Sequence, residues 1–119
     1  LSLHDALPIY IIASGSEVQL ALAVSQQLQQ TNRVISMPNM TRFLAQSSDS
    51  KAEIIPKDGA KNVIIEAGTT LGWQAVAGDN GLVIGIDEFG LSAKPQTLLD
   101  TFGMTTSCIV AKINQHLEK

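Results

Sequence analysis

The 119-residue chain has little cysteine, few aromatic residues and little charge, and each shortage excludes a class of protein. Its one cysteine, Cys108, allows neither an internal disulfide nor a zinc cage built from cysteines. The eight basic residues are scattered, whereas nucleic-acid-binding proteins cluster them in a patch. No apolar run approaches the roughly 18 residues that a membrane helix needs. We therefore expect a cytoplasmic protein that has neither nucleic acid nor a membrane as its partner.

What the chain does contain is the composition of one folded domain. Hydrophobic residues make up 45% of it. Short apolar segments rich in β-branched residues predict strands over residues 10–13, 33–37, 62–66 and 82–86. Helical patterns lie between and after them: about four turns following Ser16, a short helix at 41–46, and further helices over 69–77 and 95–102. A last helix, which Thr105 or Thr106 can cap, includes Ile109 and Leu117. This alternation predicts a three-layer α/β/α domain with a mainly parallel, four-stranded sheet and right-handed crossovers.

The first nine residues resemble the conceptual translation of a common DNA-sequencing adapter. We therefore predict that residues 1–9 are not native and that the domain runs from residue 10 to residue 119. On this interpretation His4 and Asp5 carry no function. Deleting the nine residues is expected to change stability by less than about 1 kcal/mol, the scale of an ordinary surface change.

Short motifs that would indicate an active site are absent or incomplete. The turn after the first strand contains one glycine, so it is no dinucleotide-binding loop, and the chain lacks the Gly-Lys-Ser/Thr of a phosphate-binding loop. Ser48 and Lys51 match Ser-x-x-Lys, but the motifs that accompany a catalytic serine of this type are missing. Gly78-Asp79-Asn80 resembles the start of a thiamine-diphosphate motif with a wrong third residue, and we interpret it as a turn.

Four isolated side chains have the chemistry for a site but lack partners in the sequence. Glu66 ends a strand at the edge where α/β proteins build sites, and we favour an N-cap-like or hydrogen-bonded role for it at the next helix. Trp73 is expected in the core or an interface, and Cys108 as a small buried apolar residue. His116 stands near the end of the last helix, where it complements the helix dipole rather than binding a metal.

The turn at residues 14–17 is the one plausible anion site. Backbone N–H groups at the start of a helix attract anions. Glu17 in the same turn would repel an anion, so we favour ordinary helix capping by Ser16.

Several segments, in collinear order over residues 10–118, resemble the C-terminal domain of transketolase. Residues 12–18 read Ile-Ala-Ser-Gly-Ser-Glu-Val, where the family has Ile-Ala-Thr-Gly-Ser-Glu-Val. Residues 33–38 read Arg-Val-Ile-Ser-Met-Pro, close to the family's Arg-Val-Val-Ser-Met-Pro. Further similarity lies in Phe43, Gln46, Trp73 and residues 54–56, 65–68, 85–93 and 102–105. One region departs from the family: Ser50-Lys51-Ala52 replaces its aromatic-Arg pair, which leaves a divergent, transketolase-like branch open.

The resemblance implies a sheet in the strand order 2-1-3-4, without the antiparallel edge strand that the family has just before this segment. It implies a dimeric parent enzyme of the pentose phosphate pathway that transfers a two-carbon ketol unit between sugar phosphates. Thiamine diphosphate and magnesium would be bound by the parent's other domains. No catalytic, cofactor-binding or metal-binding residue of the family falls on this chain, so the fragment is expected to be inactive alone.

The implied role is structural, with the parent's other domains and a homodimer partner as the binding partners. The alternative is the partner-binding C-terminal domain of a related thiamine-diphosphate enzyme, such as the β subunit of a 2-oxoacid dehydrogenase. Interface residues are expected in loops that follow strand ends, where large apolar side chains stand among small polar ones. They are Phe43, Leu44, Phe89 and Leu91.

Overall fold

Four parallel strands form the centre of the protein, whose computed structural model describes residues 8–15, 17–56, 58–66, 72–78, 80–85 and 106–118. Within these residues the sheet has the order β2-β1-β3-β4, and all three neighbouring pairs are parallel. The strands are β1 (Ile9–Ala13), β2 (Asn32–Ser36), β3 (Lys61–Glu66) and β4 (Leu82–Gly85). The predicted fold class, strand order and parallel sense are confirmed.

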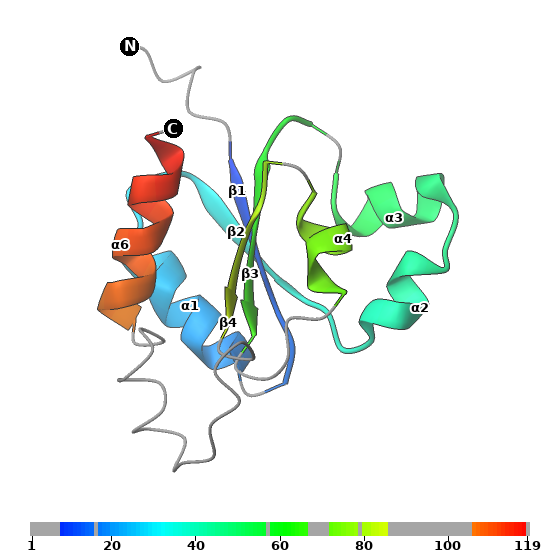
Figure 1. Cartoon of the computed structure of the whole chain (residues 1–119), viewed down its shortest axis with the longest axis horizontal. Coiled ribbons are helices and arrows are strands. Elements are labelled where there is room, and N and C mark those ends of the chain that lie inside the picture. The colour runs from blue at the N-terminus through cyan, green and yellow to red at the C-terminus, as the bar shows by residue number, and fades with distance from the viewer. Residues whose placement is uncertain are drawn as a thin grey trace.

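Helices cover both faces of this sheet, as a parallel sheet requires. Figure 1 shows α1 (Glu17–Gln27) and α6 (Thr106–Leu117) on one side of the strands. On the other side lie α2 (Met40–Leu44), α3 (Ser48–Ile54) and α4 (Trp73–Ala77). The predicted three-layer arrangement is therefore confirmed. In the described part of the chain, no helix is both long enough and apolar enough to cross a bilayer.

The central strand β1 is buried on both of its faces. Its alternate residues Ile9 and Ile11 pack with α1 and α6, while Tyr10 and Ile12 pack with the helices opposite. A strand with only one covered face would alternate apolar and polar residues, and β1 does not. The continuous apolar run of β1 therefore specifies two helical layers, one on each face.

The layer of α1 and α6 shows why one residue was placed wrongly from the sequence. Ile109 and Ile113, four residues apart, are fully buried against the sheet and against Val24 of α1. Cys108 is exposed, so the expectation that it is a buried residue is wrong. One residue along a helix turns the side chain by about 100°, and this moves Cys108 off the face that Ile109 presents to the core.

Most strand boundaries differ from the prediction by one residue, and the larger differences lie in the helices. Helix α3 was not predicted, because none of its residues is buried and its segment therefore has no apolar periodicity. The helix instead begins at a local cap, in which the Ser47 side chain accepts a hydrogen bond from the N–H of Ser50 at 3.2 Å. Helix α1 ends at Gln27, so it has about three turns rather than four. The helix expected over 95–102 lies outside the described residues.

The first strand begins at Ile9, one residue earlier than expected. Ile9 is fully buried, and its N–H donates to the Thr31 carbonyl at 2.9 Å. It also stands in register with Asn32 of β2 and Lys61 of β3. Whatever its origin, residue 9 is therefore part of the sheet. The assignment of the preceding residues to a sequencing adapter stays a prediction.

Truncating a residue of the central strands is expected to cost much of the stability of the domain. Ile64 in β3 is fully buried beside Ile12, its register partner in β1. Ile64→Ala should lower the free energy of unfolding by about 2–5 kcal/mol, measured by urea denaturation. The matched control is Leu22→Ala in α1, because Leu22 is 49% exposed and should change the value by less than about 0.5 kcal/mol. Similar losses from both variants would contradict this account of the core.

The burial of Ile9 revises the expectation that deleting residues 1–9 changes stability by less than about 1 kcal/mol. Two deletions separate the effect of residues 1–8 from that of the strand residue Ile9. Removing residues 1–8 should change the free energy of unfolding by less than about 1 kcal/mol. Removing residues 1–9 should cost at least about 2 kcal/mol more, because it takes the buried Ile9 side chain out of the core. Chemical denaturation of both forms measures the difference. A large loss from the shorter deletion would mean that the segment is integral to the fold.

Candidate functional site

The carboxyl ends of β1 and β3 meet at the point where the chain connections diverge. The connection from β1 leads to β2 at one edge of the sheet, and the connection from β3 leads to β4 at the other. In open α/β sheets, ligands commonly bind in the crevice at such a point. Here the Ser14 hydroxyl donates to Glu66 Oε1 at 3.2 Å and joins the two strand ends. Glu66 is thus hydrogen-bonded, but to the end of β1, and its expected role at the next helix stays a prediction.

The turn at the start of α1 uses its backbone donors internally. The N–H of Glu17 donates to the Ser14 carbonyl and that of Val18 to the Gly15 carbonyl, both at 3.2 Å. Gly15 adopts a φ of 57°, a left-handed conformation that glycine takes without steric cost. An anion at this turn would have to compete with both bonds and with the Glu17 carboxylate. The geometry therefore favours a capping turn over an anion site, although Ser16 itself lies outside the described residues.

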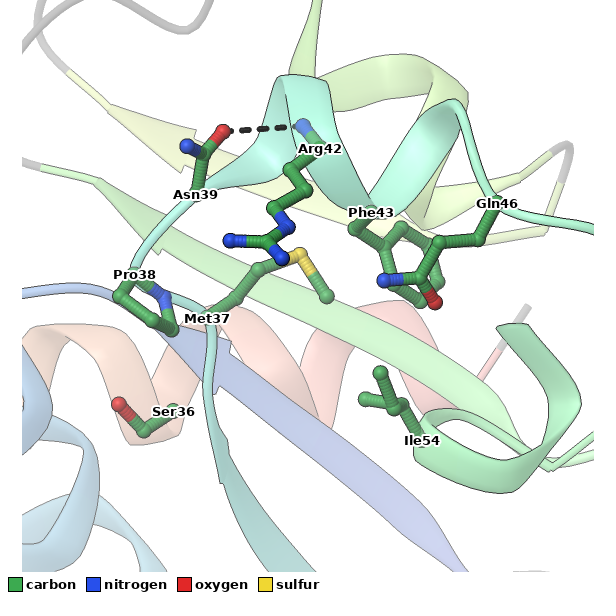
Figure 2. A pocket seen from close by; sticks show the side chains of 8 residues that line it. All are labelled: Ser36, Met37, Pro38, Asn39, Arg42, Phe43, Gln46 and Ile54. Atoms are coloured by element: carbon green, nitrogen blue, oxygen red, sulfur yellow. Dashed lines mark hydrogen bonds between the residues drawn. The ribbon is translucent and has the colours of Figure 1, made fainter. Parts of the chain in front are cut away.

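A hollow of about 210 Å³ lies beyond the carboxyl end of β2 (Figure 2). The turn after β2, helix α2 and the last residue of α3 enclose it. Its apolar lining is Met37, Pro38, Phe43 and Ile54, and its polar lining is Ser36, Asn39, Arg42 and Gln46. In Figure 2 the tip of Ile54 and the polar ends of Arg42 and Gln46 point toward the hollow.

Local hydrogen bonds fix the shape of this hollow. The Asn39 side chain caps α2, accepting a hydrogen bond from the N–H of Arg42 at 2.9 Å. One residue further on, Phe43 is buried and anchors the helix to the sheet. The cap and the anchor together direct the Arg42 side chain along the exposed face of α2. Among the described residues, no hydrogen bond or ion pair to its guanidinium is found.

Phe43 is the first of the four expected interface residues, and the structure corrects its place. It is 7% exposed and packs with Ile12, Ile64 and Trp73, so the expectation that it is exposed is wrong. The Asn39 cap begins the predicted short helix at Met40, and this helix turns the ring inward. Leu44 is half-buried against the same cluster. Phe89 and Leu91 lie outside the described residues, and their role as interface residues stays a prediction.

A second hollow, of about 390 Å³, lies on the other side of α2. Phe43, Leu44, Lys51 and Val76 are among the residues that line it, together with Asn62 of β3. The Asn62 Nδ2 group donates to the Val76 carbonyl at 3.4 Å, whereas its Oδ1 is buried without a hydrogen-bond partner in the described structure. Because this oxygen is closed off from the hollow's solvent space, it cannot receive a ligand there without a local rearrangement.

The hydroxyl group of a tyrosine in the core is hydrogen-bonded to a carboxylate. The Tyr10 hydroxyl donates to Asp58 Oδ2 at 2.6 Å, although the ring itself lies in the core. This hydrogen bond, with burial, raises the pKa of Tyr10 above its ordinary value. The same bond, with a second from the N–H of Ala60 at 3.1 Å, lowers the pKa of Asp58. The pair links β1 to the turn before β3, and it is a structural contact rather than a catalytic one.

The remaining residues with suitable chemistry have structural surroundings. Ser48 is exposed and Lys51 is half-buried in the first turns of α3, and among the described residues no acid or base is hydrogen-bonded to the Ser48 hydroxyl. Trp73 is buried, as expected for a core residue. His116 contacts the Asn80 carbonyl through Nε2 at 2.9 Å, so it joins α6 to the turn before β4. In the described ranges, no three His, Cys, Asp or Glu side chains come together as metal ligands.

The hollow beyond β2 is thus the candidate site, and its polar lining was not recognised from the sequence. Asn39, placed directly after Pro38, is the signal that could have located it. An Asn at this position predicts a helix N-terminus, and the helix that follows carries Arg42, while Gln46 lies just after its C-cap.

Comparison with known proteins adds three similarities. Residues 2–105 match the family model described as "Transketolase-like TK C-terminal domain". The chain is 41% identical over 109 residues to the transketolase of Physarum polycephalum, covering 92% of this chain and 16% of that protein. It is 40% identical over 118 residues to the transketolase of Bacillus subtilis, covering 97% of this chain and 17% of that protein.

A solved structure agrees with these sequence similarities. It is the transketolase of Pichia stipitis in complex with sedoheptulose 7-phosphate, which matches with a TM-score of 0.79 at 27% identity. The match covers 94% of this chain and 16% of that one. The chain therefore spans about a sixth of the length of the relatives that it matches.

The hydrogen bond between Tyr10 and Asp58 should couple the stability effects of substitutions at these two residues, and the coupling should depend on pH. A lowered carboxylate pKa stabilises the fold above the ordinary Asp value near 4, and this contribution is lost as the pH falls through the lowered value. A raised Tyr pKa stabilises the fold below about 10, and this contribution is lost as the pH rises through the raised value. A double-mutant cycle of Tyr10→Phe and Asp58→Ala, read by thermal unfolding, should therefore give a favourable coupling at pH 7 that disappears in acid.

The matched control for this cycle replaces Asp58→Ala with Asp49→Ala, a change at an exposed aspartate of α3. It should show no coupling to Tyr10→Phe at any pH. Additive effects of Tyr10→Phe and Asp58→Ala at pH 7 would contradict the importance of the hydrogen bond.

Proposed function

Since this chain belongs to the transketolase family through its match to the C-terminal domain, we propose that it serves as that domain in a longer transketolase. The observation that carries the proposal is the agreement of sequence and structure over almost the whole chain. About 40% identity to named transketolases comes together with a shared fold. This agreement favours the transketolase domain over the alternative, a β-subunit domain of a 2-oxoacid dehydrogenase.

The whole enzyme would transfer a two-carbon ketol unit from a ketose phosphate to an aldose phosphate in the pentose phosphate pathway. Thiamine diphosphate supplies the carbanion chemistry in such a reaction, and a protein orients the cofactor and substrate. We assign the binding of thiamine diphosphate and magnesium to the parts of the enzyme outside this chain.

The chain itself would act in assembly. Its partners would be the other domains of the same polypeptide and a second subunit of a homodimer. An acidic, weakly charged surface with scattered basic residues suits protein contacts better than nucleic acid. We expect the enzyme to work in the cytoplasm.

The proposed function is tested by replacing the C-terminal domain of Bacillus subtilis transketolase with residues 8–119 of this chain. With thiamine diphosphate and magnesium, the chimera should transfer the ketol unit within about tenfold of the parent rate, a change of about 1.4 kcal/mol in transition-state stabilisation. The parent enzyme without any C-terminal domain is the control. The 119-residue chain alone should show no turnover and no micromolar binding of the cofactor in calorimetry.

Two outcomes would contradict the proposal. One is turnover or micromolar cofactor binding by the 119-residue chain alone, which would place a cofactor site within it. The other is a chimera that forms folded dimers and binds thiamine diphosphate yet transfers no ketol unit.

A further inference from the structure

We propose that the hollow beyond β2 is a docking site for an acidic segment from the remainder of the transketolase polypeptide. One apolar side chain of that segment would fill the hollow, and a neighbouring carboxylate would bind Arg42. The inference rests on the proposed function and extends it to a particular surface. It goes beyond the expected interface residues, because the side chains that would carry the contact are Arg42 and Ile54.

The size and lining of the hollow fit one side chain. Its volume of about 210 Å³ is below the roughly 300–1,000 Å³ of pockets that hold small-molecule ligands. Met37 and Phe43 are buried at its base, and Ile54 is 36% exposed at its rim. Among the described residues, Ile54 and Leu22 are the large apolar side chains that remain exposed, and Ile54 is the one beside a hollow. An apolar side chain seated there would remove Ile54 from water.

The charge beside the hollow selects the chemistry of the occupant. Arg42 is exposed, and in the described structure its guanidinium has neither an ion pair nor a hydrogen bond. A guanidinium presents a planar set of donors that matches a carboxylate with two hydrogen bonds. Gln46 adds an amide that can donate to or accept from a backbone. These groups favour a peptide with an acidic residue over an apolar or a basic one.

The hollow is formed before anything binds. The Asn39 cap holds the first turn of α2, and the N–H of Ala45 closes its end by donating to the Thr41 carbonyl at 3.2 Å. Phe43 anchors the same helix in the core. Binding of a partner would therefore lose little conformational entropy at this surface, and this favours binding.

We take the remainder of the enzyme as the partner because of the length of the relatives. The chain spans about a sixth of its relatives, so most of such a polypeptide lies outside this domain and is available to pack against it. The hollow also lies at the carboxyl edge of the sheet, where α/β domains make their functional contacts. A second copy of this domain and a free small molecule are the competing occupants, and the experiment separates them.

The test places a photocrosslinker in the chimera with Bacillus subtilis transketolase, by Ile54→p-benzoylphenylalanine. After irradiation of the assembled enzyme, mass spectrometry identifies the crosslinked peptide. The expected partner is a peptide from outside the C-terminal domain that contains Asp or Glu. Arg42→Glu in the same chimera should reduce the crosslink yield about fivefold, because it replaces an attraction by a repulsion. The matched charge reversal Arg33→Glu, on an exposed residue of β2, should leave the yield unchanged.

The ketol-transfer activity of the same chimera tests the proposed function, and the crosslinking tests the docking site, so the two can fail separately. Three results in an active chimera would overturn the docking site and leave the proposed function standing. The crosslinker at position 54 could react only within the C-terminal domain, only with the same domain of the second subunit, or with nothing. Equal loss of crosslinking in Arg42→Glu and Arg33→Glu would also overturn it, because the effect would then come from net charge alone. A crosslink outside the domain that depends on Arg42 supports the proposal whether or not the chimera turns over.

Discussion

Burial of both faces of β1 and β3 is the constraint on which the rest of the structure depends. Ile11 and Ile12 point to opposite faces of β1, Ile64 and Ile65 do the same in β3, and all four are fully buried. Neither strand can be stable unless helices cover both faces of the sheet. The two helical layers follow from this requirement, and so does the parallel order, because each crossover has to pass over a face.

This constraint explains which parts of the fold could be predicted from the sequence. An unbroken apolar run such as that of β1 specifies a strand buried on two sides, and the alternation of such runs with helices specifies the layers. Helix α3 has no buried residue, so its formation depends on the Ser47 cap and leaves no apolar pattern. Cys108 shows the limit of the same argument, because apolar character alone did not say which side of α6 it occupies.

The candidate site was less predictable for a different physical reason. The pairing of Ser14 with Glu66 follows from topology, since both residues end adjacent parallel strands. The hollow beyond β2 depends on how α2 and α3 fold back over the sheet. No periodic pattern in the sequence predicts that Ile54 and Arg42 line the same hollow. Phe43 illustrates the difficulty: a large apolar residue among polar neighbours resembles an interface residue in the sequence, while the cap on α2 directs it into the core.

The two features at the carboxyl edge of the sheet differ in what their polar groups can still do. At the divergence of β1 and β3, the Ser14 hydroxyl donates to the Glu66 carboxylate, and the first described amides of α1 donate to backbone carbonyls of the preceding turn. A ligand would have to break these hydrogen bonds. Beyond β2, Arg42 is held over an apolar hollow with its donors unengaged by the described residues. A surface that combines a cation unpaired among the described residues with a space the size of one side chain is suited to packing against another polypeptide. On our proposal, the edge where many α/β proteins do chemistry serves assembly in this domain.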